Sequence, residues 1–345
     1  MKRLTPGILA RPMGARLTSR VGLSLACGLL AAQLSYLRAA SESRPRDLAA
    51  LWVAARALLS GQDPYTASPG LLYPLPSVIA AAPFALVPSA SLACWLFMLV
   101  GASAFAYALL EHGRGTLLGF VAPGMLFAAE VVQWTPLHAS AYALAPLGVF
   151  LIVKPHTGFP IFAAKPSWWA FGAGAVCVLA AFAIDPAWLT HWRASLALGG
   201  GHLGTATNGF PYAAPVLLPG GVLVLVALLR WRRPEARLLV ALACVPQSLY
   251  LYDTVPLFLI PRTFRESALL VVLSYAVLYL MLRGGPYPDM AHQAVASGRL
   301  YTLLLYLPAT LMVLRRSNEG ALPAWLEVRL SRLPAWLRGR EPLSA

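Results

Sequence analysis

Two aspartates flank one short segment of this sequence, PRDLAALWVAARALLSGQDPY at 45–65, in a chain with only 13 acidic residues. A carboxylate at either position could act as a general base. The apolar residues after Asp47 recur at helical spacing: Leu48, Leu51, Trp52, Ala55, Leu58 and Leu59. This pattern predicts an interfacial helix with Asp47 as its N-cap, Gly61 at its end and a turn at Asp63-Pro64. On spacing alone, capping and turn formation are the favoured interpretation of both aspartates.

Other patterns that would indicate a metal or nucleotide site do not occur in the chain. There is no D-x-D, the six histidines form no E-x-x-H or H-x3-H pair, and neither a P-loop nor G-x-G-x-x-G is found. The four cysteines lie inside apolar runs without metal-ligand spacing, which favours a role as buried small residues: Cys27, Cys94, Cys177 and Cys244. The sequence therefore predicts no metal, no cofactor and no cytoplasmic nucleotide site.

The elements that must position the candidate residues are membrane helices. Of the 345 residues 59% are hydrophobic and 12% charged, against about 25% charged in soluble domains. The apolar runs are too long and continuous for barrel strands, so we predict an all-α polytopic membrane protein with about nine to twelve crossings. Prolines inside several runs favour broken helices around an internal cavity. The candidate spans are 21–40, 71–88, 89–110, 117–133, 137–153, 168–184, 211–230, 238–252, 268–282 and 300–314.

The net charge of +14 is concentrated at the ends of the apolar runs. Residues 1–20 carry five Lys or Arg and no acid, and further clusters are RWRRPEAR at 230–237 and Arg315-Arg316. Cations in such places act as topology signals and contact membrane lipids, so nucleic acid is excluded as a partner and 1–20 is predicted to be a cytoplasmic arm. A cleaved signal peptide is the weaker alternative, because the run 21–40 is long for one.

The charges also divide the chain into regions. The predicted transmembrane domain is 21–314, and its two long polar segments, 41–70 and 185–210, are predicted to be outer loops. Counting spans from the two basic clusters gives conflicting results, so either 71–110 crosses once or 154–167 contains another short span. The tail 315–345 repeats LPAWL at 322–326 and 333–337 with interleaved arginines, which predicts a basic amphipathic helix on the membrane surface.

Beyond these patterns, the chain resembles a known family. The string D-x4-W-x2-A-x-A-L-L-x-G-x-D-P-Y from Asp47 to Tyr65, followed by YPLPSVIAAAPFALVPSASLACWLF (73–97), is similar to glycosyltransferase family 87. EVVQWTPL (130–137) and LIVKPHTGFPIF (151–162) resemble that family's Gln-containing loop and its Lys-Pro element. The resemblance covers about residues 20–165 and implies a GT-C-like bundle of membrane helices with an amphipathic outer-loop helix.

The resemblance also implies an activity and a place for it. Enzymes of this family take a sugar, typically mannose, from a polyprenyl-phosphate donor, so a glycolipid or glycan acceptor and membrane lipids would be the other partners. An acid in the first outer loop serves as the base, and Asp47 matches that position. The expected enzyme is an inverting glycosyltransferase of a bacterial cytoplasmic membrane, with its site facing the periplasmic or extracellular side.

Cations and polar groups on that side would bind the donor phosphate or sugar. The candidates are Arg44, Arg46, Arg56, Tyr65, Gln133, Lys154, His156, Asp253, Arg262 and Arg265. Several have alternative explanations. Lys154 could be an inside-facing topology charge, the two last arginines could be interfacial residues that snorkel, and Asp253 could pair with Arg262.

Two other functions compete with the transferase. A transporter or flippase would also contain broken helices, but its halves usually correspond, and 1–170 shows no correspondence to 171–345. A degenerate family member that only binds lipid is the third hypothesis.

Overall fold

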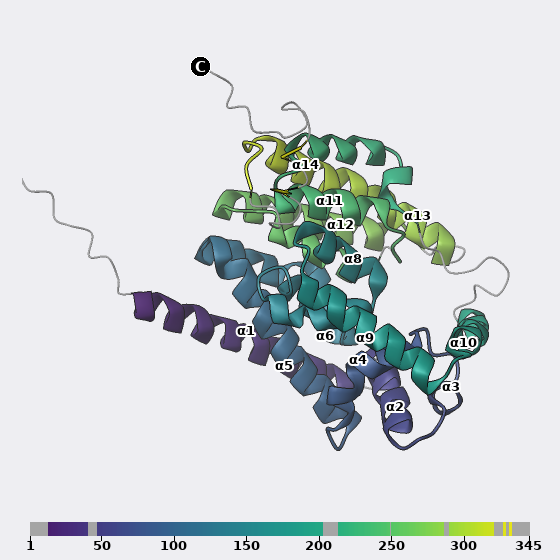
Figure 1. Cartoon of the computed structure of the whole chain (residues 1–345). Helices are drawn as coiled ribbons and strands as arrows, with labels where there is room; N and C mark the ends of the chain where they lie inside the picture. Colours follow the sequence, from purple (N-terminus) through teal and green to yellow (C-terminus); the bar gives the residue numbers. More distant parts are fainter. Residues whose placement is uncertain are drawn as a thin grey trace, which may run out of the picture.

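The computed structural model describes residues 13–40, 47–202, 213–248, 250–285, 290–320, 327–328 and 331–332 (Figure 1). This part of the chain is helical and contains no β-strand, as the composition predicted. Residues 1–12 of the basic arm and most of the tail 315–345 lie outside it, so the arm and the surface helix of the tail stay predictions. Arg44 and Arg46 also lie outside the described residues.

The elements are helices of three kinds, where η1 to η6 are 3-10 helices and η7 is a π-helix. In chain order they are α1 (Met13–Ala40), α2 (Asp47–Leu59), α3 (Pro64–Ala67), α4 (Leu75–Ala85), α5 (Ala90–Leu109), η1 (Leu110–His112), η2 (Arg114–Val121), α6 (Pro123–Val131), α7 (Thr135–Ser140), η3 (Ala145–Ile152), α8 (Pro155–Ala164), α9 (Trp168–Ile184), α10 (Trp188–His202), η4 (Pro215–Leu217), η5 (Gly221–Arg230), α11 (Pro234–Cys244), η6 (Leu251–Leu259), α12 (Phe264–Arg283), α13 (Met290–Tyr301), η7 (Thr302–Tyr306) and α14 (Leu307–Leu314).

Fewer long membrane helices are present than the nine to twelve crossings that we expected. In the described ranges four helices are long and apolar enough to cross a membrane: Leu17–Arg38, Ala90–His112, Phe264–Arg283 and Val295–Leu314. A fifth would be the pair Trp168–Ile184 and Trp188–Leu198, which is bent by 93°. These helices make the protein membrane-embedded, while the other apolar runs are divided into shorter pieces.

Prolines explain most of these divisions. The run 117–133 is split between η2 and α6, and Pro123 is the first residue of the second piece. The run 137–153 is split between α7 and η3, with Pro146 in the first turn of η3, and α8 then begins at Pro155. Proline has no backbone N–H and is best accommodated in the first turn of a helix, so these two runs restart as new helices at their prolines. Pro83 and Pro160, in contrast, lie inside α4 and α8.

The long helices α1 and α5 lie side by side, and their ends mark two opposite sides of the fold. The guanidinium of Arg20 donates to the carbonyl of Tyr107 at 2.6 Å, so the beginning of α1 lies beside the end of α5 and the two helices are antiparallel. The two helices approach each other closely at Gly28, where any larger side chain would collide with Ser103. A 20-residue helix is about 30 Å long, so its two ends lie on different sides of the fold.

Helix α2 and both ends of α4 lie at the side where α5 begins. The indole of Trp52 in α2 donates to the carbonyl of Val87, after α4, at 3.2 Å. The hydroxyl of Tyr73, before α4, donates to Asp47 at 3.2 Å. Because α4 starts and finishes beside α2, the run 71–110 has one long pass, which is α5. This arrangement favours the first of the two alternatives left open by the topology count.

The opposite side carries an ion-pair network that we term the arginine end: Glu235, Arg262, Glu266 and Arg316. Glu235 Oε1 is fully buried and accepts from Arg262 Nη2 at 2.5 Å and from Arg316 Nη1 at 3.2 Å. Arg316 also donates to Glu266 at 2.9 Å. Lys165 lies 3.9 Å from Glu111, just after α5, and so belongs to this side as well.

Replacing the buried carboxylate of the arginine end should destabilise the fold. Glu235→Gln leaves Arg262 and Arg316 without their shared anion, and removing one member of a buried ion pair costs about 3 kcal/mol. We expect a clear drop in melting temperature in detergent. Glu319→Gln, which changes an exposed acid near Arg233, is the matched control and should leave the melting temperature unchanged. Equal melting temperatures of the two variants would contradict a stabilising role of the Glu235 ion pairs.

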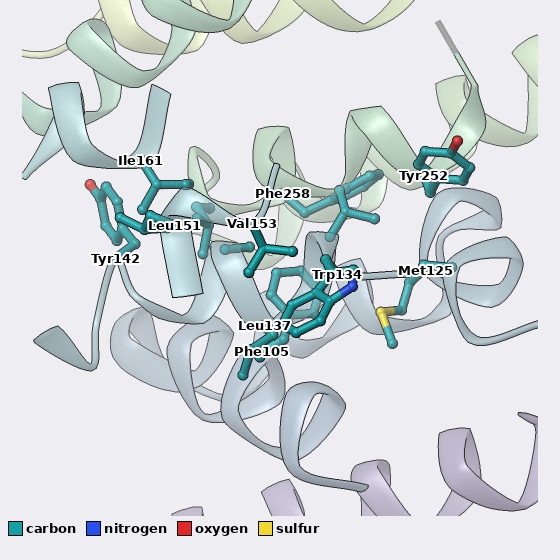
Figure 2. Packing of buried hydrophobic residues seen from close by; sticks show 14 of the residues in the cluster. Phe105, Met125, Trp134, Leu137, Tyr142, Leu151, Val153, Ile161, Tyr252 and Phe258 are labelled. Carbon is teal, nitrogen blue, oxygen red and sulfur yellow. The ribbon is translucent and has the colours of Figure 1, made fainter. Parts of the chain in front are cut away.

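The core is formed by residues from both halves of the chain. Trp134 is fully buried and lies against the rings of Phe97 and Phe150, with centroids 4.7 and 5.9 Å away. Around it Figure 2 shows Phe105, Met125, Leu137, Leu151, Ile161 and Phe258, which belong to α5, α6, α7, η3, α8 and η6 respectively. This packing matters for the site, because Trp134 directly follows Gln133 and Val153 directly precedes Lys154.

Candidate active site

One oxygen of Asp47 is the meeting point of three side chains from distant parts of the sequence. Asp47 Oδ2 accepts from Tyr73 OH at 3.2 Å, from Gln133 Nε2 at 2.5 Å and from Lys154 Nζ at 2.9 Å. The donors lie 26, 86 and 107 residues from Asp47 along the chain. We term these four residues the Asp47 cluster. Its carboxylate side chain remains 35% exposed.

Lys154 is held by more than its ion pair. Its ammonium also donates to Gln133 Oε1 at 2.5 Å and lies 5.3 Å from the ring centroid of Tyr73 and 5.5 Å from that of Tyr252. Both distances allow cation–π attraction. The side chain is 11% exposed. Lys154 thus pairs with Asp47, whereas Lys165 lies at the arginine end, so the two lysines do not share one side of the fold.

The local backbone directs Gln133 and Lys154 toward Asp47. Helix α6 ends at Val132, whose φ of 56° and ψ of 58° are left-handed, and this is the only non-glycine residue with positive φ among those described. That conformation is costly for a β-branched side chain and is found where surrounding structure enforces it. The turn takes Gln133 off the helix axis. Lys154 has extended backbone because Pro155 follows it, so its side chain leaves the chain before α8 begins.

A cavity of about 800 Å³ opens beside the Asp47 cluster. Its volume lies within the range of small-molecule sites. Asp47, Lys154 and His156 supply its charged or titratable wall, while most of the surface is apolar or aromatic: Leu72, Tyr73, Pro74, Val153, Phe159, Trp192, Leu196, Tyr250 and Tyr252. The site therefore combines one carboxylate and one ammonium with a large apolar chamber.

The remaining candidates near the cavity have supporting positions. His156 lines it directly. Tyr65 is buried behind it and donates to the carbonyl of Tyr73 at 3.4 Å, so it supports the wall without forming it. Asp253 is buried and accepts from the hydroxyl of Ser248, a lining residue, at 2.6 Å.

Three arginines that we predicted to bind the donor are not at the cavity. Arg262 belongs to the arginine end, where it pairs with Glu235 rather than with Asp253. Arg265 is exposed in the first turn of α12, beside that same end. Arg56 lies on α2 about two and a half turns after Asp47 and therefore on the opposite face of the helix. It contributes to a separate hollow with Trp52, where its guanidinium lies 5.0 Å from the indole.

The two aspartates of the opening segment have different surroundings. Asp63 caps α3, because its carboxylate accepts from the backbone N–H of Tyr65 at 3.0 Å and of Thr66 at 3.2 Å. Partial burial raises the pKa of Asp63, but the hydrogen bonds from Thr66 and Tyr65 outweigh it and lower that pKa below its ordinary value. The predicted turn is confirmed. Asp47 is the first described residue of helix α2, and the residues before it lie outside the described ranges, so its role as the N-cap stays a prediction.

Sequence reasoning missed several aromatic residues of the site. Tyr73 contacts Asp47 and Lys154, Tyr252 stands beside Lys154, and Trp192 in α10 lines the cavity. Tyrosine and tryptophan are common in membrane-interface segments, so nothing in their local sequence marks them as wall residues. Only the periodic face of α10 could have suggested that Trp192 and Leu196 point the same way.

The described residues contain no group of three or more His, Cys, Asp or Glu side chains that could hold a metal ion. The chemistry available to them is that of a paired carboxylate and ammonium beside an apolar chamber. No family model matches the chain, and no curated protein or solved structure is significantly similar to it.

Proposed function

We propose that this protein is an inverting membrane glycosyltransferase with a GT-C-like fold, which transfers a sugar from a polyprenyl-phosphate donor to a lipid or glycan acceptor. Mannose is the expected sugar. The observation that supports this function best is the Asp47 cluster at the wall of a largely apolar cavity. An acid, a cation and an apolar chamber are what a lipid-linked sugar phosphate requires.

The proposed chemistry assigns one task to each charged group. The acceptor oxygen forms a bond to the anomeric carbon while the bond from that carbon to the phosphate oxygen breaks. Asp47 takes the proton from the acceptor hydroxyl. The bonding electrons leave with the phosphate, whose charge Lys154 stabilises, so no general acid is needed. Gln133 holds both partners, because it donates to Asp47 and accepts from Lys154.

The apolar wall supports a lipid-linked donor over a soluble nucleotide sugar. The first isoprene units of such a carrier would lie against residues such as Phe159, Leu196 and Tyr250. Burial of hydrocarbon contributes about 0.8 kcal/mol per CH₂ group. A polar nucleotide would instead leave hydrogen-bonding groups unpaired against the same wall.

The charge distribution supports a site at the outer face. The arginine end lies on the side of the fold opposite α2, and arginines concentrate on the cytoplasmic side of membrane proteins. The Asp47 cluster would then face the periplasm or the exterior. The location of its membrane in a bacterial cell envelope is part of the same proposal.

The test is a transfer assay with purified protein in nanodiscs. Polyprenyl-phosphate mannose with a labelled sugar is mixed with glycolipid extracts, and the expected result is label in an acceptor with free polyprenyl phosphate as the second product. The mass of the glycan lost when the gene is deleted would name the acceptor. Uptake of a solute into sealed vesicles without any transfer would overturn the proposal in favour of a transporter.

A further inference from the structure

Tyr73 contacts both charged members of the Asp47 cluster. Its hydroxyl donates to Asp47 Oδ2 at 3.2 Å, and its ring centroid lies 5.3 Å from Lys154 Nζ. The side chain is buried, so the hydroxyl can adopt few other positions. A single residue is thereby in contact with the carboxylate and with the cation that neutralises it.

The segment that carries Tyr73 has no regular secondary structure of its own. Between α3 and α4, three successive carbonyl groups accept hydrogen bonds from side chains of other elements. Leu71 accepts from Ser195 Oγ at 2.9 Å and Leu72 from Trp192 Nε1 at 3.0 Å. Tyr73 accepts from Tyr65 OH at 3.4 Å. The position of Tyr73 is therefore set by tertiary contacts, two of which come from α10.

Helix α10 is itself firmly oriented relative to α9. The two helices meet at 93° around Asp185, whose carboxylate accepts from the backbone N–H of Ala187 at 2.9 Å and lies 2.7 Å from His191 Nδ1. Trp188 is buried beneath the bend and packs against Phe182, with ring centroids 5.6 Å apart. The bend places α10 so that Ser195 and Trp192 reach the 71–73 backbone.

We infer that Tyr73 is a positioning residue for the Asp47–Lys154 pair and that α10 holds Tyr73 in place through the carbonyl groups of Leu71 and Leu72. This inference rests on the proposed function for its effect on transfer. Tyr73 donates to the same oxygen as Gln133 and Lys154, so it stabilises the anionic carboxylate and keeps the second oxygen directed away from this cluster. Sugar transfer would then depend on α10, although that helix supplies no group to Asp47 itself.

The test compares Tyr73→Phe with the control Tyr275→Phe. Tyr275 lies in α12, and its hydroxyl donates to the carbonyl of Val121, away from the Asp47 cluster. Tyr73→Phe keeps the ring near Lys154 and removes only the donor to Asp47. We expect kcat to fall about tenfold with the donor KM unchanged, because a hydrogen bond to a charged group is lost.

A second measurement does not depend on transferase activity. Hydrophobic carbodiimides modify protonated carboxyl groups in membranes, and modification at Asp47 can be read by mass spectrometry. We expect Tyr73→Phe to be modified about tenfold faster than the wild type at the same pH. Lys154, His156, Tyr250 and Tyr252 also face this carboxylate and are unchanged in the variant, so the difference reports on Tyr73.

The possible outcomes separate the two proposals. An unchanged modification rate at Asp47 overturns the role of Tyr73 whether or not the protein transfers sugar. A faster rate together with wild-type protein that transfers no sugar from any polyprenyl-phosphate donor supports the positioning role and overturns the proposed function. A rise in donor KM with unchanged kcat would make Tyr73 a donor-binding residue instead.

The role of α10 has its own variant and control. Ser195→Ala removes the buried hydroxyl that donates to Leu71, whereas Ser274→Ala removes a buried hydroxyl that donates at 2.7 Å to Val271 within its own helix. We expect Ser195→Ala to lower kcat and to accelerate modification of Asp47 in the same direction as Tyr73→Phe, by a smaller factor. If the two serine variants behave alike, α10 does not hold Tyr73.

Discussion

Asp47→Asn is expected to abolish sugar transfer, with kcat falling by about a thousandfold. Asparagine has nearly the same shape as aspartate but cannot accept the proton of the acceptor hydroxyl. Its side-chain oxygen can still accept hydrogen bonds from Lys154 and Tyr73, so the protein should stay folded. The measurement is transfer from polyprenyl-phosphate mannose by purified protein, with melting temperature and gel filtration as checks of folding.

Asp63→Asn is the matched control for this prediction. It is the other acid of the opening segment, it lies on the same side of the fold, and asparagine serves equally well as the cap of α3. Transfer by this variant should equal that of the wild type. Near-normal transfer by Asp47→Asn would remove Asp47 from the proposed mechanism, and an equal loss in both variants would indicate a general effect of charge in this region.

Lys154→Met is expected to lower kcat/KM for the donor by about a hundredfold or more, the usual cost of removing one stabilising group from the developing charge. The departing phosphate would lose its cation, and Asp47 would lose the partner that lies 2.9 Å away. Methionine preserves most of the apolar stem of lysine, so the cavity wall should be little changed. The measurement is the dependence of the transfer rate on donor concentration.

Lys165→Met provides the comparison, because Lys165 follows the other end of the same helix, α8. It is 38% exposed and lies 3.9 Å from Glu111, and pairs of this kind contribute about 1 kcal/mol or less. The kcat/KM of Lys165→Met for the donor should therefore match that of the wild type. Equal losses in both lysine variants would contradict a specific role of Lys154 at the phosphate.

The double variant Asp47→Asn with Lys154→Met tests whether Asp47 and Lys154 act together or independently. Contacting residues usually give less than additive effects. We expect the double variant to lose less activity than the two single losses combined, because each single substitution also deprives the other residue of its ion-pair partner. Full additivity of the two losses would indicate that Asp47 and Lys154 act independently, despite the hydrogen bond between them.

Several features of this protein could be predicted from neighbouring residues alone. The helix from Asp47 to Leu59 follows from its apolar period, and Leu48, Leu51 and Ala55 are buried as that period requires. The cap at Asp63 follows from its place before Pro64. The membrane helices follow from composition, because a continuous apolar run is helical in lipid whatever surrounds it. Each of these depends on interactions within a few turns of chain.

The described ranges contain fewer long helices than the nine to twelve crossings that we expected, and the reason is also local. Hydropathy measures how apolar a run is but not whether its backbone can continue as one helix. Pro123 and Pro155 begin new helices within or beside apolar runs, and the predicted span 71–88 contains only the 11-residue helix α4. Giving more weight to proline positions would have reduced the expected count of unbroken helices.

The partners of the charged residues were decided by tertiary structure. Lys154 and Lys165 stand at the two ends of one helix in similar apolar sequence, yet one pairs with Asp47 and the other lies beside Glu111. From the sequence Arg262 could have paired with Asp253, but it pairs with Glu235. Each choice depends on segments tens of residues apart that meet only when the helices pack.

The sequence by itself thus determined the helices, the caps and the membrane environment, since local spacing and composition are enough to specify them. Tertiary structure alone decided that Tyr73, Gln133 and Lys154 converge on Asp47. Coulombic attraction and hydrogen bonding act over a few ångströms and carry no signature in the intervening chain. Their outcome depends on how the aromatic core around Trp134 and the bend before α10 arrange the elements that bear these side chains.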